Sequence, residues 1–284
     1  MRANASVLIA PLITTPIAPP LAKRADAPDS SGLDTSVGKA LAVLDAFRGE
    51  GSVLGVSQVA ERACLPKSTT HRLLNLLVEH GYIERTDARY RLSRAIFELG
   101  NMVSDCRPRS LRAIAMPFMT ELYESTHATV HLAVLDGHDV LYVEKIYGHH
   151  GVSLPSRVGG RVPALCTALG KAILGFSSTD RIEAAFSVPV PRLTQRTIVN
   201  PGVLRDILAR VRETGIAQDS EGSTLGACCL AAPVLAKDST VLGAVSVSFS
   251  TSERVSPLAI QQLKRSAGLI GERVDRQGIP VSAL

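Results

Sequence analysis

The sequence predicts an α+β protein in which two folded units follow one another. Its length of 284 residues is long for one domain. Apolar residues recur at three and four positions in the first hundred residues, which predicts short helices, and alternate later in the chain, which predicts strands. We expect a disordered tail over 1–32, a first unit over 33–94, a linker helix region over 95–126 and a second unit over 127–279.

The first unit is expected to begin with an amphipathic helix over 35–48, where apolar residues recur every three or four positions. Gly49 and Gly51 follow it and favour a helix end. Ser57 is a good capping residue, so a second helix is expected from Ser57 to about Leu65.

The third helix is expected to start at or near Pro66, because proline suits the first helical turn, and to end before Gly81. The next segment, YIERTDARYRL over 82–92, alternates on both sides of the turn residues 86–88 and predicts a hairpin. Three helices followed by a two-stranded hairpin are the elements of a winged helix-turn-helix.

Helical angles divide the polar run LPKSTTHRLL of the third helix into two faces. Thr70, Leu73, Leu74 and Leu77 cluster on one side, which predicts the buried face, and the polar residues lie opposite and on the flank. A solvated face with ordinary helix-start chemistry is the alternative. The candidate DNA-binding residues are Lys67, Ser68, Thr69, His71, Arg72 and Asn75 of this helix, Ser57 of the helix before it, and Arg85, Arg89 and Arg91 of the hairpin.

Side-chain chemistry favours DNA binding over a merely solvated face. Arg72 and Asn75 can bond purine edges, whereas Lys67 and the helix amino terminus suit phosphates. Basic residues outnumber acidic ones between Arg62 and Arg94. The whole chain carries a net charge of +5, which permits a polyanionic partner without requiring one.

Composition indicates a cytoplasmic globular protein with no membrane association. The five cysteines form no CxxC pair and their number is odd, which predicts free thiols in a reducing compartment. No apolar run reaches the roughly 18 residues needed to span a bilayer. The amino terminus can mimic a secretory signal, but four prolines interrupt its apolar run, which favours a disordered tail or an overlong start assignment.

A long helical stretch is expected over 93–126, with breaks near Arg107-Pro108 and at Pro117. Strands then dominate the second unit, and the helices between them are expected to cover the sheet in a sensor-like arrangement. The expected strands are 128–135, 139–147, 215–219, 227–236 and 241–250, the expected helices are 166–176, 179–186, 201–214 and 256–275, and a glycine-rich link lies at 159–160.

Two hydroxyls in the last strand indicate a site. Ser246 and Ser248 are two positions apart, so both side chains leave the strand on one face. Hydroxyls on a buried strand need partners, which neighbouring backbone groups or a ligand can supply. Strand alternation also sends the adjacent Cys228 and Cys229 to opposite faces, which argues against a redox pair.

The segment TALGKA is not a phosphate loop, because its glycine spacing is wrong and Ala172 replaces the required hydroxyl residue. It predicts a helix start whose free N–H groups at Ala168 and Leu169 can receive an anion. If His127 and His131 share a strand, they lie about 13 Å apart, too far for one metal ion. We expect no metal and no cofactor.

Several segments together resemble one known family. The first unit contains GKALAVLDAF, SQVAERACLPKSTTHRLLNLLVEHGYIER and YRLS, and the second contains GGRVPALCTALGKA, GIAQDSEGSTLGACCLAAPV and GAVSVSF. These runs, spanning about 35–275, resemble the IclR (isocitrate lyase regulator) family of bacterial transcriptional regulators. The chain departs from the family pattern at Cys166, where histidine is usual.

The resemblance implies a winged helix-turn-helix domain joined by a linker helix to a GAF-like α/β effector-binding domain, with the third helix in the major groove of DNA. Hydroxyls and backbone N–H groups suit a small carboxylate, with Leu154 and Leu165 as apolar wall. Asp219 is expected to contact a hydroxyl or water, because two like charges repel. The implied effector-binding residues are Ala168, Leu169, Asp219, Cys229, Ser246 and Ser248.

The function expected from these observations is that of a ligand-responsive transcription regulator, not an enzyme. We expect a repressor of a catabolic or metabolic operon that binds a near-palindromic operator as a homodimer or homotetramer and responds to a small organic acid. The alternative is a thiol-dependent enzyme with Cys229 as the nucleophile. No histidine lies close to Cys229 in sequence, although a partner distant in sequence stays open.

Overall fold

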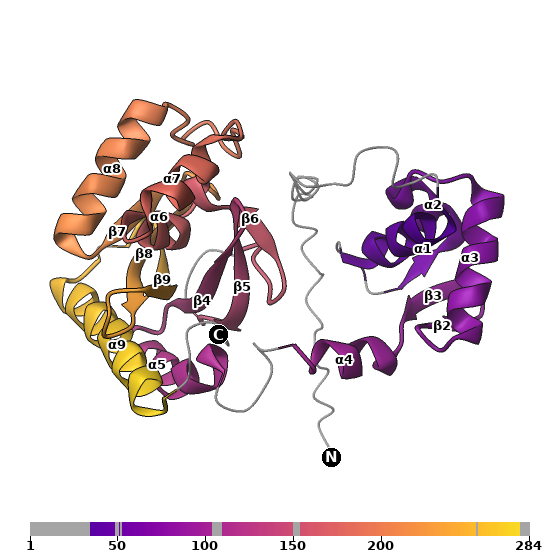
Figure 1. Ribbon diagram of the computed structural model, residues 1–284, viewed down its shortest axis with the longest axis horizontal. Helices are drawn as coiled ribbons and strands as arrows, with labels where there is room; N and C mark the ends of the chain where they lie inside the picture. The colour runs from indigo at the N-terminus through magenta and orange to yellow at the C-terminus, as the bar shows by residue number, and fades with distance from the viewer. Residues whose placement is uncertain are drawn as a thin grey trace, which may run out of the picture.

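The structure is a computed structural model that describes residues 35–48, 51, 53–103, 110–149, 154–253 and 255–278. The tail expected over 1–32, the break expected near Arg107-Pro108 and Cys106 lie outside the described residues. Figure 1 draws the described elements as a smaller helical unit and a larger unit around a sheet. None of the described helices is long and apolar enough to cross a membrane.

The first unit contains the three helices and the hairpin that the sequence predicts, in the predicted order. Its elements are α1 (Ser36–Asp45), the 3-10 turn η2 (Ala46–Arg48), β1 (Leu54–Gly55), α2 (Val56–Ala63), α3 (Lys67–Glu79), β2 (Ile83–Thr86) and β3 (Arg89–Leu92). The short strand β1 was not predicted. It pairs with β3, opposite β2, through Leu54 and Tyr90. Two residues are too few to show alternation, so only the pairing reveals this strand.

The predicted cap of the second helix is wrong, whereas the predicted start of the third helix at or near Pro66 is confirmed. Ser57 does not cap α2, because the helix begins at Val56 with Gly55 as its cap residue. The Gln58 side chain accepts a hydrogen bond from the Gly55 N–H at 2.9 Å, and this contact defines the start. Pro66 precedes α3 as its cap residue in an extended conformation and is not part of the helix.

α5 (Leu111–Thr126) runs through Pro117, so the break expected there is wrong. Proline lacks the N–H that would bond the carbonyl of Ala113, which removes one helical hydrogen bond. The helix continues because its inner side is firmly packed, with Met119 and Leu122 at most 1% exposed.

The second unit is a six-stranded antiparallel sheet in the order β6-β5-β4-β9-β8-β7. Its elements are β4 (Thr129–Asp136), β5 (Asp139–Ile146), β6 (Arg161–Pro163), the 3-10 turn η4 (Ala164–Cys166), α6 (Ala168–Gly175), α7 (Thr179–Phe186), α8 (Pro201–Thr214), β7 (Ala217–Ser220), β8 (Ala227–Leu235), β9 (Val241–Ser250) and α9 (Pro257–Arg276). The edge strand β6 was not predicted, and only a glycine-rich link at 159–160 was expected before it. Pairing with β5 makes it a strand.

Helices cover both faces of this sheet (Figure 1). α5 and α9 pack on one face, where Leu132, Val245 and Val247 join the core. α6 and α8 cover the other face, where Ala231 and Ala244 join a second core. Because side chains alternate along β9, its serines lie on the α6 side, opposite the valines.

Candidate DNA-binding and effector sites

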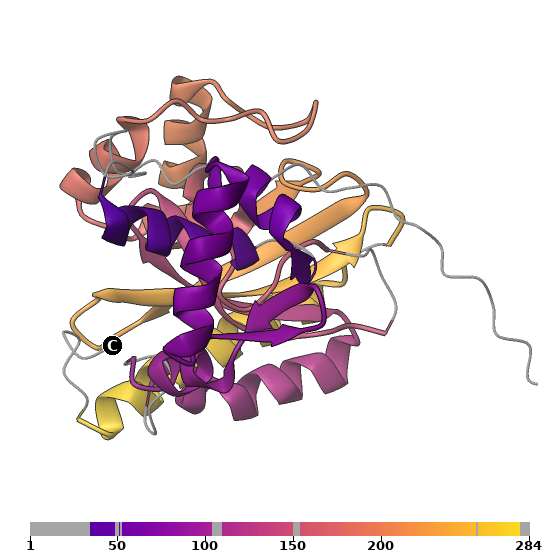
Figure 2. The ribbon, with the colours of Figure 1, turned by 90° about the vertical axis from the view of Figure 1, so that its right-hand side faces the viewer.

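α3 has the buried and exposed sides that the helical angles predict. Thr70, Leu73 and Leu74 are at most 4% exposed, and Leu77 is half-buried. Figure 2 shows α3 along the front of the first unit, with its outer side uncovered by any described element. The exposed polar residues of this helix include Lys67, Ser68, His71, Arg72 and Asn75, and Thr69 is half-buried.

The amino end of α3 is open to an anion. No side chain caps this end, because Pro66 occupies the cap position. The first N–H groups of a helix have no partner within the helix, so those of Lys67, Ser68 and Thr69 point outward. A phosphate oxygen is a suitable acceptor for such groups. Ser57 lies exposed in the first turn of the neighbouring helix α2.

The three arginines of the hairpin differ in their freedom to bind DNA. Arg91 forms an ion pair with Glu84 across the hairpin, with an N–O distance of 2.6 Å. Arg85 donates from Nε to the carbonyl of Asp87 at 2.9 Å. Arg89 is exposed and forms no ion pair among the described residues. Arg89 is therefore the hairpin cation most available to a phosphate.

Cross-strand pairing gathers four predicted effector residues on the sheet face beneath α6. Asp219 pairs with Cys229, and Cys229 pairs with Ser248. Ser246 lies two positions along β9, and directly paired residues share a face. The Ser248 Oγ and Cys229 Sγ atoms are 3.1 Å apart, so this hydroxyl contacts a side chain. Ser246 is 2% exposed, and its hydroxyl has no hydrogen-bond partner among the described residues.

α6 brings its amino end to this face. The helix begins two residues later than predicted, because Thr167 is extended and caps it by accepting a hydrogen bond from the Gly170 N–H at 3.0 Å. The N–H groups of Ala168 and Leu169 have no partner among the described residues, and both residues are at most 3% exposed. The end of α6 can therefore receive an anion from within the domain.

A buried ion pair that the sequence did not reveal neutralises Asp219. Lys171 Nζ lies 2.6 Å from Asp219 Oδ1, and the two side chains are 2% and 5% exposed. Asp219 Oδ2 accepts a hydrogen bond from the Ser223 N–H. The positive charge of Lys171 therefore offsets the repulsion expected between Asp219 and a ligand carboxylate. Lys171 belongs to TALGKA, but 48 residues separate it from Asp219, and no local pattern reports such a pair.

His131 is a second residue that the sequence did not assign to the site. It pairs with Ser246, so it lies on the same face of the sheet, and its Nε2 lies 2.8 Å from Ser156 Oγ. Its pKa is lowered to about 3, mainly by burial and then by the charge of Lys145. His131 is therefore a neutral hydrogen-bonding group at pH 7.

The strand position assumed for His127 is wrong. His127 ends α5 in a left-handed conformation and precedes β4, so it does not share a strand with His131. Among the described residues, no group of three metal-ligating side chains comes together.

Lys145 holds the segment that was expected to supply the apolar wall. Its Nζ donates to the carbonyl oxygens of Leu154 at 3.2 Å and Ser156 at 2.6 Å. Burial lowers the pKa of Lys145 to about 8. Leu154 is half-buried beside this cation, and Leu165 is 3% exposed in η4.

The thiol of Cys229 is poorly suited to nucleophilic catalysis. Burial is the main cause that raises its pKa to about 12. Its side-chain hydrogen bond is to Ser248, and none of the described histidines forms a hydrogen bond with the sulfur. A thiol that stays protonated at pH 7 is a weak nucleophile, which argues against the thiol-enzyme alternative.

Comparison with known protein families identifies both units. The model of the IclR helix-turn-helix domain matches residues 36–87, and that of the bacterial transcriptional regulator IclR C-terminal domain matches residues 106–273. The chain is 35% identical over 220 residues to the HTH-type transcriptional regulator XynR of Escherichia coli, covering 76% of this chain and 86% of that protein. It is 28% identical over 262 residues to the transcriptional repressor IclR of Escherichia coli, covering 87% and 95%.

Solved structures agree with this match. An IclR homolog from Microbacterium hydrocarbonoxydans, complexed with 4-hydroxybenzoate, has a TM-score of 0.75 and 28% identity, covering 85% of this chain and 100% of that chain. The IclR protein of Thermotoga maritima has a TM-score of 0.67 and 27% identity, covering 85% and 97%. This chain therefore belongs to the IclR family of transcriptional regulators, with a DNA-binding helix-turn-helix domain followed by an effector domain.

Proposed function

We propose that this chain is a repressor of a catabolic or metabolic operon that binds a palindromic operator and responds to a small organic acid. One observation carries the proposal. The same chain holds an uncovered polar helix with an open amino end and, in its second unit, a buried polar face with two free N–H groups and an unpartnered hydroxyl. The first suits DNA and the second suits a carboxylate. The repressor role is supported by the similarity to the repressor IclR.

On the DNA side, α3 lies in the major groove and the hairpin contacts the backbone. Arg72 and Asn75 contact bases, because their side chains can bond two atoms of a guanine or an adenine edge. Arg89 contacts phosphate from the hairpin. The further phosphate contacts come from Ser57, Lys67, Ser68, Thr69, His71 and Arg85, and from Arg91 where it leaves Glu84.

Gel shifts test these roles with DNA from upstream of the gene for this protein. Arg72→Ala and Asn75→Ala should each weaken specific binding by about 1–3 kcal/mol and relax base preference. Arg89→Ala should weaken binding to all DNA and flatten the dependence on salt. Arg181→Ala, an exposed arginine of α7, serves as the control. Normal specific affinity in Arg72→Ala would contradict the proposed orientation of α3.

On the effector side, the ligand carboxylate lies at the amino end of α6 and accepts hydrogen bonds from Ala168 N–H, Leu169 N–H and Ser246. Ser248 and Cys229 lie beside Ser246 on the same face of the sheet. The Lys171 ammonium compensates the charge of Asp219. Because these residues are nearly all buried, the ligand reaches the face only when the domain opens.

Thermal unfolding of the full chain tests the effector side. Small organic acids at millimolar concentration, among them pyruvate and 4-hydroxybenzoate, should raise the melting temperature, because a ligand that binds only the folded state stabilises it. Ser246→Ala should lose most of this shift, whereas Ser57→Ala, an exposed serine of α2, should keep it. If no acid of the series shifts the wild-type protein, the organic-acid proposal fails.

A further inference from the structure

A large polar side chain, Tyr142, lies on the proposed effector face without a partner for its hydroxyl. Tyr142 stands on β5 opposite Ala133 of β4, and both residues join the core beneath α6. The residue is 8% exposed. Its backbone is held by hydrogen bonds to Gly159 and Gly160, but its hydroxyl has no hydrogen-bond partner among the described residues. A hydroxyl without a protein partner at the border of a buried face is available to a ligand or to water.

The ring of Tyr142 packs in the same core as Cys229, on the sheet face that carries the proposed effector residues. The pKa of its hydroxyl is raised, first by burial and then by the negative charges that Cys229 and Asp219 can carry. The phenol is therefore a neutral donor at pH 7. Its ring centroid lies 5.2 Å from that of His131, which itself contacts Ser156.

The hydroxyls of Ser246 and Tyr142, which both lack a hydrogen-bond partner among the described residues, therefore lie on the same face of the sheet. Ser246 lies near the middle of the sheet on β9, and Tyr142 lies on β5, two strands away, or about 10 Å between backbones. The phenol ring spans part of this gap, so the two hydroxyls can contact different atoms of one small ligand. Asp219 is less suited to this second contact, because Lys171 and Ser223 already occupy its oxygens.

We propose that Tyr142 determines specificity in the effector site: its phenol donates a hydrogen bond to an oxygen that the ligand carries in addition to its carboxylate. The site then favours hydroxy and oxo acids over the corresponding plain acids. A site built to bond a ligand oxygen discriminates against the analogue without it, because the buried phenol is left unpaired. This inference rests on the proposed effector site.

The test compares three matched pairs of acids that differ by one oxygen function: pyruvate with propionate, glycolate with acetate, and 4-hydroxybenzoate with benzoate. Dissociation constants are measured by calorimetry on the full chain. Wild-type protein should bind the oxygenated member of at least one pair roughly tenfold more tightly. Tyr142→Phe keeps the ring and should remove this preference, with the affinity for the plain acid unchanged.

Tyr147→Phe is the matched control, because it makes the same change just beyond the same strand at a ring that is 67% exposed. It should behave like the wild type. Three results would overturn the assignment of Tyr142 but leave the proposed acid site intact. They are equal affinities for the two acids of every pair, a preference for the oxygenated acid that persists in Tyr142→Phe, and an equal loss of affinity for both acids of a pair in Tyr142→Phe. Failure of all six acids to bind would overturn the proposed effector site together with this inference.

Discussion

His131 connects the candidate effector site to pH. Burial and the charge of Lys145 lower its pKa from 6.5 to about 3. In the unfolded chain the ring keeps its ordinary pKa, so below pH 6.5 the unfolded state binds a proton that the folded state does not. The contribution of His131 to the stability of the folded state is therefore complete above pH 6.5, and it is lost as the pH falls from 6.5 toward 3.

Replacing His131 is expected to remove this part of the acid sensitivity. The wild-type free energy of unfolding should fall by up to about 1.4 kcal/mol per pH unit through this group, and His131→Asn should show a correspondingly shallower slope. Urea unfolding between about pH 6 and about pH 4 measures both. His80→Asn, an exposed histidine after α3, is the control. An unchanged slope in His131→Asn would mean that other groups dominate the acid sensitivity.

At the scale of single elements, α6 fits beneath η4 because residue 170 has no side chain. A Cβ at Gly170 would lie 2.1 Å from the carbonyl oxygen of Ala164 and 2.4 Å from its Cα, both backbone atoms that cannot swing away. This close approach places the first turn of α6 against η4. The two free N–H groups at Ala168 and Leu169 are positioned by the same contact.

Gly170→Ala is therefore expected to destabilise the effector domain by about 3 kcal/mol or more, and to reduce ligand binding by displacing the start of α6. Gly268→Ala is the matched control in α9, where an added Cβ meets nothing within 4 Å. It should stabilise the domain by about 1 kcal/mol, because alanine favours helix over glycine. Thermal and urea unfolding measure both variants. Equal stability of the two variants would contradict the close packing of α6.

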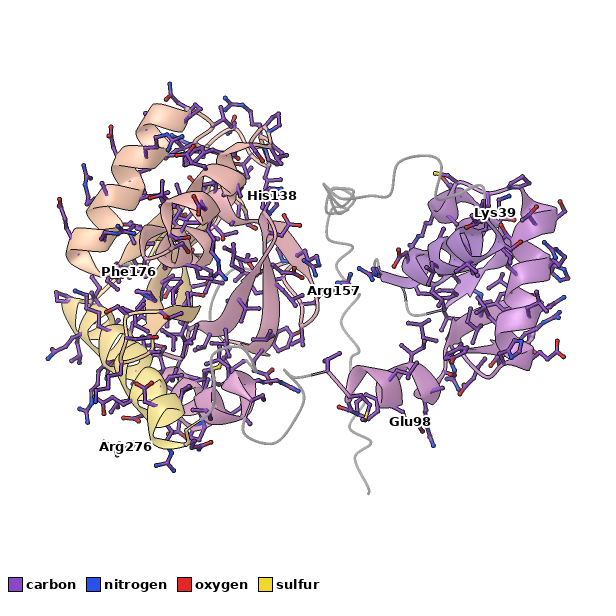
Figure 3. All side chains as sticks on the ribbon, viewed as in Figure 1. Lys39, Glu98, His138, Arg157, Phe176 and Arg276 are labelled. Carbon is purple, nitrogen blue, oxygen red and sulfur yellow. The ribbon has the colours of Figure 1, made fainter. Side chains whose placement is uncertain are left out.

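At the scale of the whole molecule, large apolar side chains remain uncovered on α1 and α4 (Arg94–Gly100). Phe97 and Val37 are 71% and 70% exposed, and α4 has no buried residue. Figure 3 shows α4, marked by Glu98, in the segment between the two units. The exposed apolar residues in and just after these helices are Val37, Leu41, Phe97, Leu99, Met102 and Val103. Exposed apolar residues that gather on one helix, as on α4 and just after it, favour association.

We propose that the exposed apolar residues of α4 and of the segment just after it join two copies of the chain, because the palindromic operator proposed above would be read by a two-fold symmetric protein. Phe97→Asp is expected to lower the molar mass in solution at micromolar concentration, measured by light scattering, because it places a charge in the contact. Leu258→Asp, at a leucine of α9 that is 60% exposed, is the control. An unchanged mass for Phe97→Asp would place the contact elsewhere.

The local pattern of the sequence determined most of the elements and the outer surface of α3. The buried side of α3 follows from spacings of three and four between Thr70, Leu73, Leu74 and Leu77. Arg72 lies outside this set and is exposed. Ser246 and Ser248 share a face because strand geometry has a period of two. These predictions needed only contacts within one element, which sequence spacing encodes directly.

Tertiary structure decided what completes the effector site. Lys171 meets Asp219 across 48 positions, and Tyr142 and His131 join Ser246 only through the pairing of β5, β4 and β9. It also decided that β1 exists and that α5 continues through Pro117, since pairing and burial outweigh the local signals there. Such contacts depend on which strands become neighbours, and one sequence carries no local pattern for that choice.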